Sequence, residues 1–253
     1  MIPEERRRKI IKLVEEHGGV LSISSLMSLL EVSHMTVRRD VQILEEQKLL
    51  VSVTGGVQLS SILSREPTHA DKEVMNADKK KKIGIEAAKR IPSNSCIYLD
   101  AGTTSLALAQ IIAPRSDLVI VTNDFEVLNY LMDRTKSSVI HTGGQVLKDN
   151  RSAAGPLATK ILSSLAINLA FLSASSWDAR GATTPDINKV AVKETVIKAS
   201  SHRILISDST KYGQVASFIT FPLTAVDEII TDDGLQDNAV RIIQNLGVAV
   251  TRV

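Results

Sequence analysis

Two adjacent arginines follow a serine and a threonine in the stretch SHMTVRRDVQIL, residues 33–44. An arginine side chain can bind a phosphate or pair with two acceptors on a guanine. The start of a helix favours anions because its first N–H groups have no partner within the helix. Ser33 is a suitable cap for a helix that runs to about Gln47. This cluster indicates a surface for nucleic acid, although arginine pairs also occur on helix faces that meet only solvent.

A second group of polar residues follows short apolar runs later in the chain. CIYLD ends in Asp100, and AGTTS then leads into an apolar helix. Gly102 to Thr104 could offer N–H and hydroxyl donors to a phosphate, although a tight turn with a helix cap gives the same pattern. Further polar groups follow the later runs and lie at 122–123, 143–144, 173–176 and 208–211, with Lys193 and Glu194 on a helix expected to begin at TTPD, 183–186. Together they predict a cleft for an anionic metabolite.

Three helical segments must position the arginine cluster. Apolar spacing predicts helices over Pro3–His17, about Ser22–Glu31 and Ser33–Gln47. The short turn before Ser33 is typical of a helix-turn-helix, and KLLVSVTGGVQLS after it predicts a hairpin wing.

Helical spacing separates the residues of the third helix into a core-facing side and an outer side. Val37, Val41 and Leu44 share one side at helical spacing and are expected to face the first two helices. Met35, Arg38, Arg39 and Gln42 then lie on the outer side. Asp40 is expected either to hold an arginine in place or to be plain surface charge.

The polar strand ends require a different architecture. Apolar runs such as LVIVT and RILISD alternate with helical segments from residue 95 onward, which is typical of strands buried on both faces of a mainly parallel sheet. Such sheets bind ligands beyond the carboxyl ends of their strands. The predicted fold class is α/β, with a small N-terminal winged helix-turn-helix domain at 1–59, a linker at 60–82 and a larger mainly parallel α/β domain at 83–253. The lysines at 79–82 could approach a DNA backbone or form the solvated first turns of a helix.

Composition limits the alternatives. The chain has 253 residues, of which 43% are hydrophobic and 23% charged, so a folded protein is expected. Aromatic residues make up only 3%, which disfavours a surface that stacks single-stranded bases. A single cysteine, Cys96, excludes an intrachain disulfide and a cysteine-based zinc cluster. Net charge is +2 and residues 1–59 hold eight basic and eight acidic side chains, so nucleic-acid binding would depend on local clustering. With neither a signal peptide nor a membrane segment evident, a cytoplasmic location is expected.

The motif VSHMTVRRDVQIL resembles the winged helix-turn-helix of the DeoR family of bacterial transcription regulators, through Val32, Ser33, Thr36, Arg38, Arg39, Asp40 and Leu44. The family wing usually carries an arginine and a histidine before its Gly-Gly, where this chain has Ser52 and Thr54. The resemblance therefore places more of the binding on the helix. The DNA-binding candidates are Ser33, His34, Met35, Thr36, Arg38, Arg39, Gln42 and Lys48.

The later blocks YLDAGTTSLALA, HTGGQV, TTPD and ISDSTKYG are similar in order to the sensor domain of the same family, which is related in fold to sugar-phosphate isomerases and usually senses a phosphorylated sugar. Where the family commonly has Gly-Ala-Asp, this chain has Ser173-Ala174-Ser175, so altered selectivity is expected. The resemblance implies these effector-binding candidates: Asp100, Gly102, Thr103, Thr104, Asn123, Gly143, Gly144, Ser175, Lys193, Asp208 and Lys211.

The resemblance implies a regulator, expected to be a repressor of a carbohydrate-utilisation operon, that binds double-stranded operator DNA as a homo-oligomer, a dimer or a tetramer. A small-molecule effector is expected, with neither a cofactor, a metal nor a membrane partner. One alternative is an isomerase-like enzyme with an appended DNA-binding domain, but no paired general acid and base stands out in the sequence. Another is that the cleft is a structural remnant and protein partners alone regulate the chain.

Overall fold

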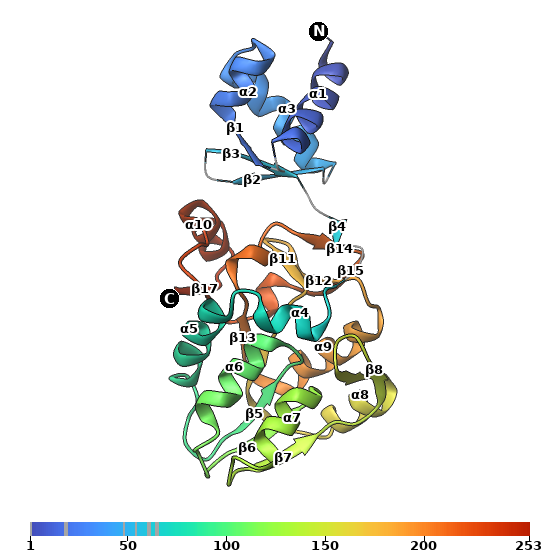
Figure 1. The fold of residues 1–253 in the computed structure, drawn as a ribbon, viewed down its shortest axis with the longest axis vertical. Helices are drawn as coiled ribbons and strands as arrows, with labels where there is room; N and C mark the ends of the chain where they lie inside the picture. The colour runs from blue at the N-terminus through green and yellow to red at the C-terminus, as the bar shows by residue number, and fades with distance from the viewer. Residues whose placement is uncertain (1, 18–19, 48, 54, 60–61, 64–65) are drawn as a thin grey trace.

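The computed structural model describes residues 2–17, 20–47, 49–53, 55–59, 62–63 and 66–253. In the N-terminal part, three helices and three short strands follow one another: α1 (Pro3–Glu16), β1 (Val20–Ser22), α2 (Ile23–Leu30), α3 (His34–Glu46), β2 (Leu50–Val53) and β3 (Gly56–Leu59). The strands form an antiparallel sheet in the order β1-β3-β2. The predicted helices and hairpin are confirmed, and β1 is an additional strand that pairs with the wing (Figure 1).

Local signals explain how these helices begin and turn. The Ser22 side chain caps α2, and the Ser33 side chain caps α3 by accepting a hydrogen bond from the Thr36 N–H at 3.3 Å. Between them Glu31 adopts a left-handed conformation with φ of 53°, which ends α2 and turns the chain. Val37, Val41 and Leu44 are buried against α1 and α2, as the apolar spacing predicts.

A parallel sheet forms the centre of the larger domain. Its strands, in spatial order, are β17 (Ala249–Arg252), β16 (Glu228–Thr231), β13 (Ser200–Ile206), β10 (Ile167–Leu172), β5 (Cys96–Leu99), β6 (Val119–Thr122) and β7 (Ser138–His141). Each neighbouring pair is parallel. The predicted α/β class is thereby confirmed, and the carboxyl ends of the strands lie at one edge.

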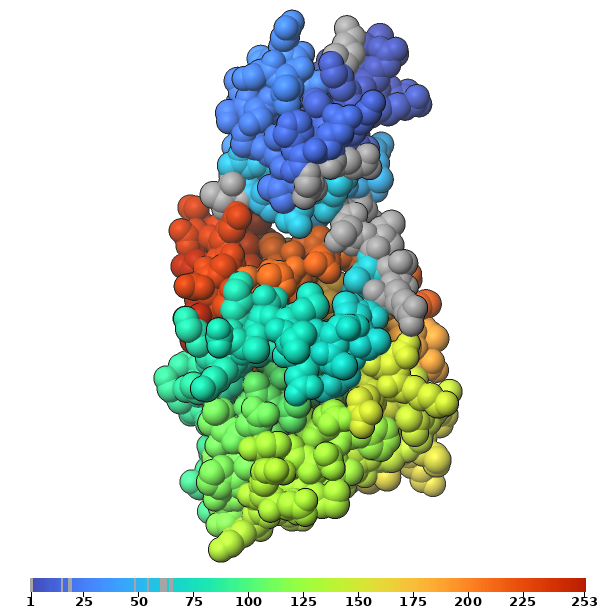
Figure 2. Space-filling view, viewed as in Figure 1, coloured from blue at the N-terminus to red at the C-terminus, as the bar shows by residue number. Residues whose placement is uncertain are grey.

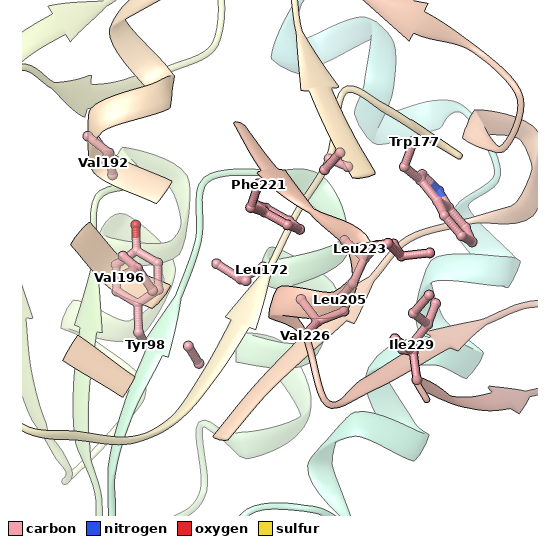
Figure 3. Close-up of a cluster of buried hydrophobic side chains, with 14 of the residues drawn as sticks. Tyr98, Leu172, Trp177, Val192, Val196, Leu205, Phe221, Leu223, Val226 and Ile229 are labelled. Atoms are coloured by element: carbon pink, nitrogen blue, oxygen red, sulfur yellow. The ribbon is translucent and has the colours of Figure 1, made fainter. Parts of the chain in front are cut away.

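Helices cover both faces of this sheet because the strand residues alternate between them. One apolar core joins the sheet to α5 (Ala77–Ala88), α6 (Thr103–Ile112) and α7 (Phe125–Met132). The other joins it to α8 (Pro156–Leu162), α9 (Asn188–Ala199) and α10 (Asp237–Asn245). Tyr98, Leu172 and Leu205 point into the second core beside Trp177 and Phe221 (Figure 3).

Smaller elements surround the strand ends. They are β8 (Gln145–Leu147) paired with β9 (Ser152–Ala154), the antiparallel set β11 (Ser176–Asp178), β12 (Gly181–Thr184) and β15 (Phe218–Pro222), and the pair β4 (Ile62–Leu63) and β14 (Val215–Ala216), with short 3-10 turns η1 (Ser209–Lys211) and η2 (Leu223–Ala225). The expected helix start at TTPD is wrong: Thr183 and Thr184 end β12, and α9 begins at Asn188. The strand continues because these threonines pair with β15.

The segment predicted as a linker, 60–82, contains β4, α4 (His69–Val74) and the first turns of α5. A capping box between Thr68 and Asp71 starts α4. Of the four lysines, Lys81 and Lys82 are exposed as a solvated turn would be, but Lys80 is only 4% exposed and donates to the Lys72 and Met75 carbonyls. In Figure 2 this cyan-green stretch lies against the larger domain. Its described part therefore packs with the α/β domain.

Candidate nucleic-acid interface and effector cleft

The outer side of α3 presents the predicted DNA-binding side chains to solvent. His34, Arg38, Arg39 and Gln42 are exposed, and Met35 is 74% exposed although it is apolar. Ser33 is exposed and Thr36 is half-buried, and their hydroxyls lie 2.9 Å apart. Lys48 lies outside the described residues. An exposed apolar side chain between polar ones suits contact with base edges and thymine methyl groups.

Asp40 lies on the inner side of α3 and is only 2% exposed. Its carboxylate forms an ion pair with Arg6 and lies 3.5 Å from an Nη of Arg7, both on α1. Of the two alternatives for Asp40, the one in which it holds an arginine in place is confirmed, and the arginines come from the first helix. Arg38 and Arg39 are therefore not paired with their neighbour.

A hydrogen bond ties the wing to α3. The Ser52 N–H on β2 donates to a carboxylate oxygen of Glu45 at 2.6 Å. The Ser52 side chain is exposed and uncharged, and Thr54 lies outside the described residues. The wing strand and the end of α3 are thus fixed to one another.

At the carboxyl end of the sheet, Asp100 and Lys193 form a buried ion pair. The Asp100 carboxylate also accepts hydrogen bonds from the N–H and the hydroxyl of Ser173, each at 2.9 Å. The Lys193 amine additionally donates to the Ser173 carbonyl at 2.6 Å. The sequence places these residues 93 positions apart, and the fold brings them together because β5 and β10 are neighbours and α9 packs over them.

The loop predicted to bind a phosphate forms hydrogen bonds within the protein instead. Gly102 precedes α6 with φ of 155°, and its N–H donates to the Asp124 carboxylate at 2.8 Å. Burial raises the pKa of Asp124 to about 6, although backbone N–H groups at the start of α7 oppose the shift. Thr103 and Thr104 are buried at 7% and 2% exposure. Sequence reasoning missed Asp124, whose signal is an aspartate placed to cap the helix that follows β6.

Asn123 and the two adjacent glycines serve the local structure. The Asn123 side chain accepts from the Tyr98 hydroxyl at 2.8 Å and donates to the Ala153 carbonyl at 2.9 Å. Gly144 has φ of 118°, and a Cβ there would lie 2.5 Å from the Ala154 carbonyl oxygen, so a side chain does not fit. Gly143 is left-handed with φ of 59°. Neither glycine is among the residues that line the cavities described below.

Three adjoining hollows mark the cleft. One of about 430 Å³ includes Asn150, Asp186 and Lys189 in its lining, and one of about 250 Å³ includes Lys72 and the predicted Ser175, Asp208 and Lys211. A constricted space of about 20 Å³ lies against Asp100, Asn123, Ser175 and Lys193. Glu66 lines all three.

The predicted residues beside the second hollow have partners of their own. The Lys211 amine donates to the Ala174 carbonyl at 3.0 Å, and Asp208 accepts from Thr210 and from Asn76. The Ser175 hydroxyl is 3.5 Å from that of Thr184. Asp208 and Lys211 thus line the hollow that contains Lys72, while Ser175 lines both that hollow and the constricted space beside Asp100.

Glu66, Lys72 and Lys189 are cleft residues that sequence reasoning missed. The Glu66 carboxylate pairs with the Lys72 amine at 2.7 Å and with the Lys189 amine. Lys189 stands four residues before Lys193 on α9, so the two share one side of the helix and the spacing could have revealed it. Glu66 and Lys72 lie in the predicted linker, whose sequence gives no such signal.

Comparisons with known proteins cover both parts of the chain. Residues 6–62 match a family described as the DeoR-like helix-turn-helix domain, and residues 75–233 match one described as the DeoR C terminal sensor domain. An uncharacterized HTH-type transcriptional regulator of Haemophilus influenzae is 46% identical, over 98% of this chain and 96% of its own length. One of Escherichia coli is 47% identical, over 100% and 99%. The glycerol-3-phosphate regulon repressor of Escherichia coli is 31% identical over 90% of each chain.

Among solved structures, ribose 5-phosphate isomerase A of Methanocaldococcus jannaschii matches 54% of this chain and 55% of its own, with 15% identity and a TM-score of 0.40. No helix among the described residues combines the length and the apolar character needed to cross a bilayer. Within the same residues, no three His, Cys, Asp or Glu side chains gather closely enough to hold a metal ion.

Proposed function

This chain belongs to the DeoR family of transcriptional regulators, and we propose that it is a cytoplasmic repressor that binds double-stranded operator DNA through α3 and responds to a phosphorylated sugar or a related anionic metabolite. The observation that carries the proposal is that α3 has one buried side and one exposed, positively charged side. Its apolar side and Asp40 are buried, while Arg38 and Arg39 are exposed at its front. Among the described residues, neither guanidinium group has an ion-pair or hydrogen-bond partner that would give it a role in folding.

The side chains of α3 are assigned DNA-contact roles according to where they point around the helix. Arg38, Arg39 and Thr36 are placed to meet the sugar-phosphate backbone or guanine, while His34, Met35 and Gln42 are placed to read base edges. A helix-turn-helix dimer reads two half-sites, so we propose a homo-oligomer, with an effector that changes the relative placement of its two recognition helices.

Exchanging both Arg38 and Arg39 for alanine tests the DNA-binding role. Each lost base or phosphate contact costs about 1–3 kcal/mol, so the double variant should bind at least about 30-fold more weakly. The probe is a duplex selected by the wild-type protein from a random-sequence library, and binding is measured by fluorescence anisotropy at several salt concentrations. A shallower salt dependence in a single variant would identify that arginine as a phosphate contact.

The matched control removes two exposed cations from the larger domain, with Lys160→Ala on α8 and Lys198→Ala on α9. It should bind the selected duplex as the wild type does. Both double variants should melt within about 2 °C of the wild type, because surface changes of this kind rarely alter stability. Equal affinity of the arginine variant and the control would rule out the proposed interface.

For the larger domain, we propose binding without turnover of a small anionic ligand at the carboxyl ends of β5, β10 and β13, with neither a cofactor nor a metal. The buried Asp100–Lys193 pair and the lysines around Glu66 support an anion-binding cleft. The relatives above are named as regulators, which favours sensing over catalysis. A thermal-shift screen of sugar phosphates tests this, since a ligand bound only by the folded protein raises its melting temperature.

A further inference from the structure

Glu66 lies between two amines in a mostly enclosed position. The side chains of Glu66, Lys72 and Lys189 are 16%, 10% and 12% exposed. Burial by itself would raise the pKa of the Glu66 carboxyl, but the charges and hydrogen bonds of Lys189 and Lys72 lower it well below its usual range. The carboxylate is therefore held as an anion by two cations.

The segment that carries Glu66 is fastened across the ends of the strands. The His69 N–H donates to the Asp149 carbonyl at 2.8 Å, and the Lys72 amine donates to the Asn150 side chain at 2.7 Å. Lys80 binds the carbonyls at the end of α4. Glu66 also stands only seven residues beyond Leu59, the last residue of wing strand β3.

Two other cation or donor groups at the strand ends already have partners. Lys193 is paired with Asp100, and the Gly102 N–H is donated to Asp124. Lys72 and Lys189 form their ion pairs with Glu66, and this carboxylate stands where the larger hollows adjoin. A hollow of about 430 Å³ is large enough for a small metabolite, whereas the 20 Å³ space beside Asp100 is not.

We propose that Lys72 and Lys189 form an anion subsite of the effector cleft, and that Glu66 occupies it until the phosphate or carboxylate group of the effector takes its place. This inference rests on the proposed function and assigns the regulation of that same site. An effector anion must satisfy both amines as Glu66 leaves, which is a direct exchange of one anion for another. The exchange thus removes the ion pairs that hold Glu66, seven residues beyond the end of wing strand β3, to Lys72 on α4 and Lys189 on α9.

Glu66→Gln in the full-length protein tests the exchange, because glutamine keeps the shape of the side chain and removes its charge. The probes are inorganic phosphate and glycerol 3-phosphate, with binding measured by isothermal titration calorimetry at constant ionic strength. The variant should bind at least one of them about tenfold more tightly than the wild type. Glu73→Gln is the matched control, since Glu73 is an exposed residue of α4, and it should leave affinity unchanged.

Adding Lys189→Gln to Glu66→Gln should abolish the gain, which distinguishes this subsite from general loss of negative charge. If Glu66→Gln does not fold, Lys72→Gln and Lys189→Gln in the otherwise wild-type protein must each weaken binding of the tighter probe about tenfold. Unchanged affinity in Glu66→Gln, or in both lysine variants, would overturn the proposal. Operator binding by the wild-type protein is measured separately, so such a result would leave the proposed regulator intact.

Discussion

Replacing Lys193 by methionine removes the cation that faces the buried Asp100 carboxylate while keeping most of the side-chain volume. Removing one partner of a buried ion pair costs about 3–5 kcal/mol, since the other charge stays buried without compensation. Asp100 still accepts two hydrogen bonds from Ser173, so the lower end, about 3 kcal/mol, is expected. In a domain of this size that loss corresponds to a fall of roughly 6–12 °C in melting temperature.

A second change should restore part of this loss. In the double variant Asp100→Asn/Lys193→Met the buried charge is gone, and the amide oxygen can still accept from the Ser173 N–H. We therefore expect the double variant to melt above Lys193→Met, although it lacks both members of the pair. Scanning calorimetry of the wild type, both single variants and the double variant provides the complete cycle.

Two results would refute this reasoning about Asp100 and Lys193. One is a melting temperature of Lys193→Met within about 2 °C of the wild type, which would mean that the pair is screened by solvent. The other is a double variant whose loss equals the sum of the two single losses, which would mean that the charges do not interact. The same four proteins, titrated with a ligand found by thermal shift, show whether the pair also contributes to binding.

Two further predictions concern other parts of the fold. Gly56→Ala would place a Cβ 2.5 Å from the Leu21 carbonyl oxygen, so it should destabilise the N-terminal domain by about 1–3 kcal/mol. Hydrogen exchange in α1–α3 should therefore become faster. Exchange rates equal to those of the wild type would contradict the close approach of β1 and β3. For Asp124, the folded-state pKa of about 6 exceeds the unfolded value of 3.8, so the native state binds the proton more tightly. Its stabilising contribution is full below about pH 4 and is lost as pH rises through 6, by roughly 3 kcal/mol at most. Urea unfolding of Asp124→Asn from pH 4 to 7 should therefore show the variant gaining stability relative to the wild type as pH rises, and a constant difference would refute the shift.

Much of the fold follows from local pattern. The apolar spacing of Val37, Val41 and Leu44 predicts the buried side of α3, and continuous aliphatic runs predict the parallel strands, because periodicity reports which side of an element leaves water. Of the candidate site, the same logic brings Asp100 and Lys193 to one edge of the sheet.

The spacing of apolar and polar residues does not show which side chains pair across long separations in the chain. Asp40 meets Arg6 from 34 residues away, and Glu66 meets Lys189 from 123 residues away. The local sequence at Gly102 predicts a free N–H donor for a phosphate, whereas in the fold this N–H donates to Asp124, 22 residues away. A segment with little apolar periodicity, such as 66–76, is held by polar contacts to distant residues, so its own sequence does not reveal its position.

Because Asp40 points inward, the exposed surface at the front of α3 carries more positive charge than its sequence suggests. In the sequence, Arg-Arg-Asp carries one net positive charge, and the domain sums to zero. In the folded domain Asp40 is buried beneath the helix at 2% exposure and pairs with Arg6 and Arg7 on α1, so it does not neutralise Arg38 or Arg39. An approaching polyanion therefore meets two guanidinium groups that form no ion pair with any described residue, and a charge count along the chain underestimates the attraction at the place where it acts.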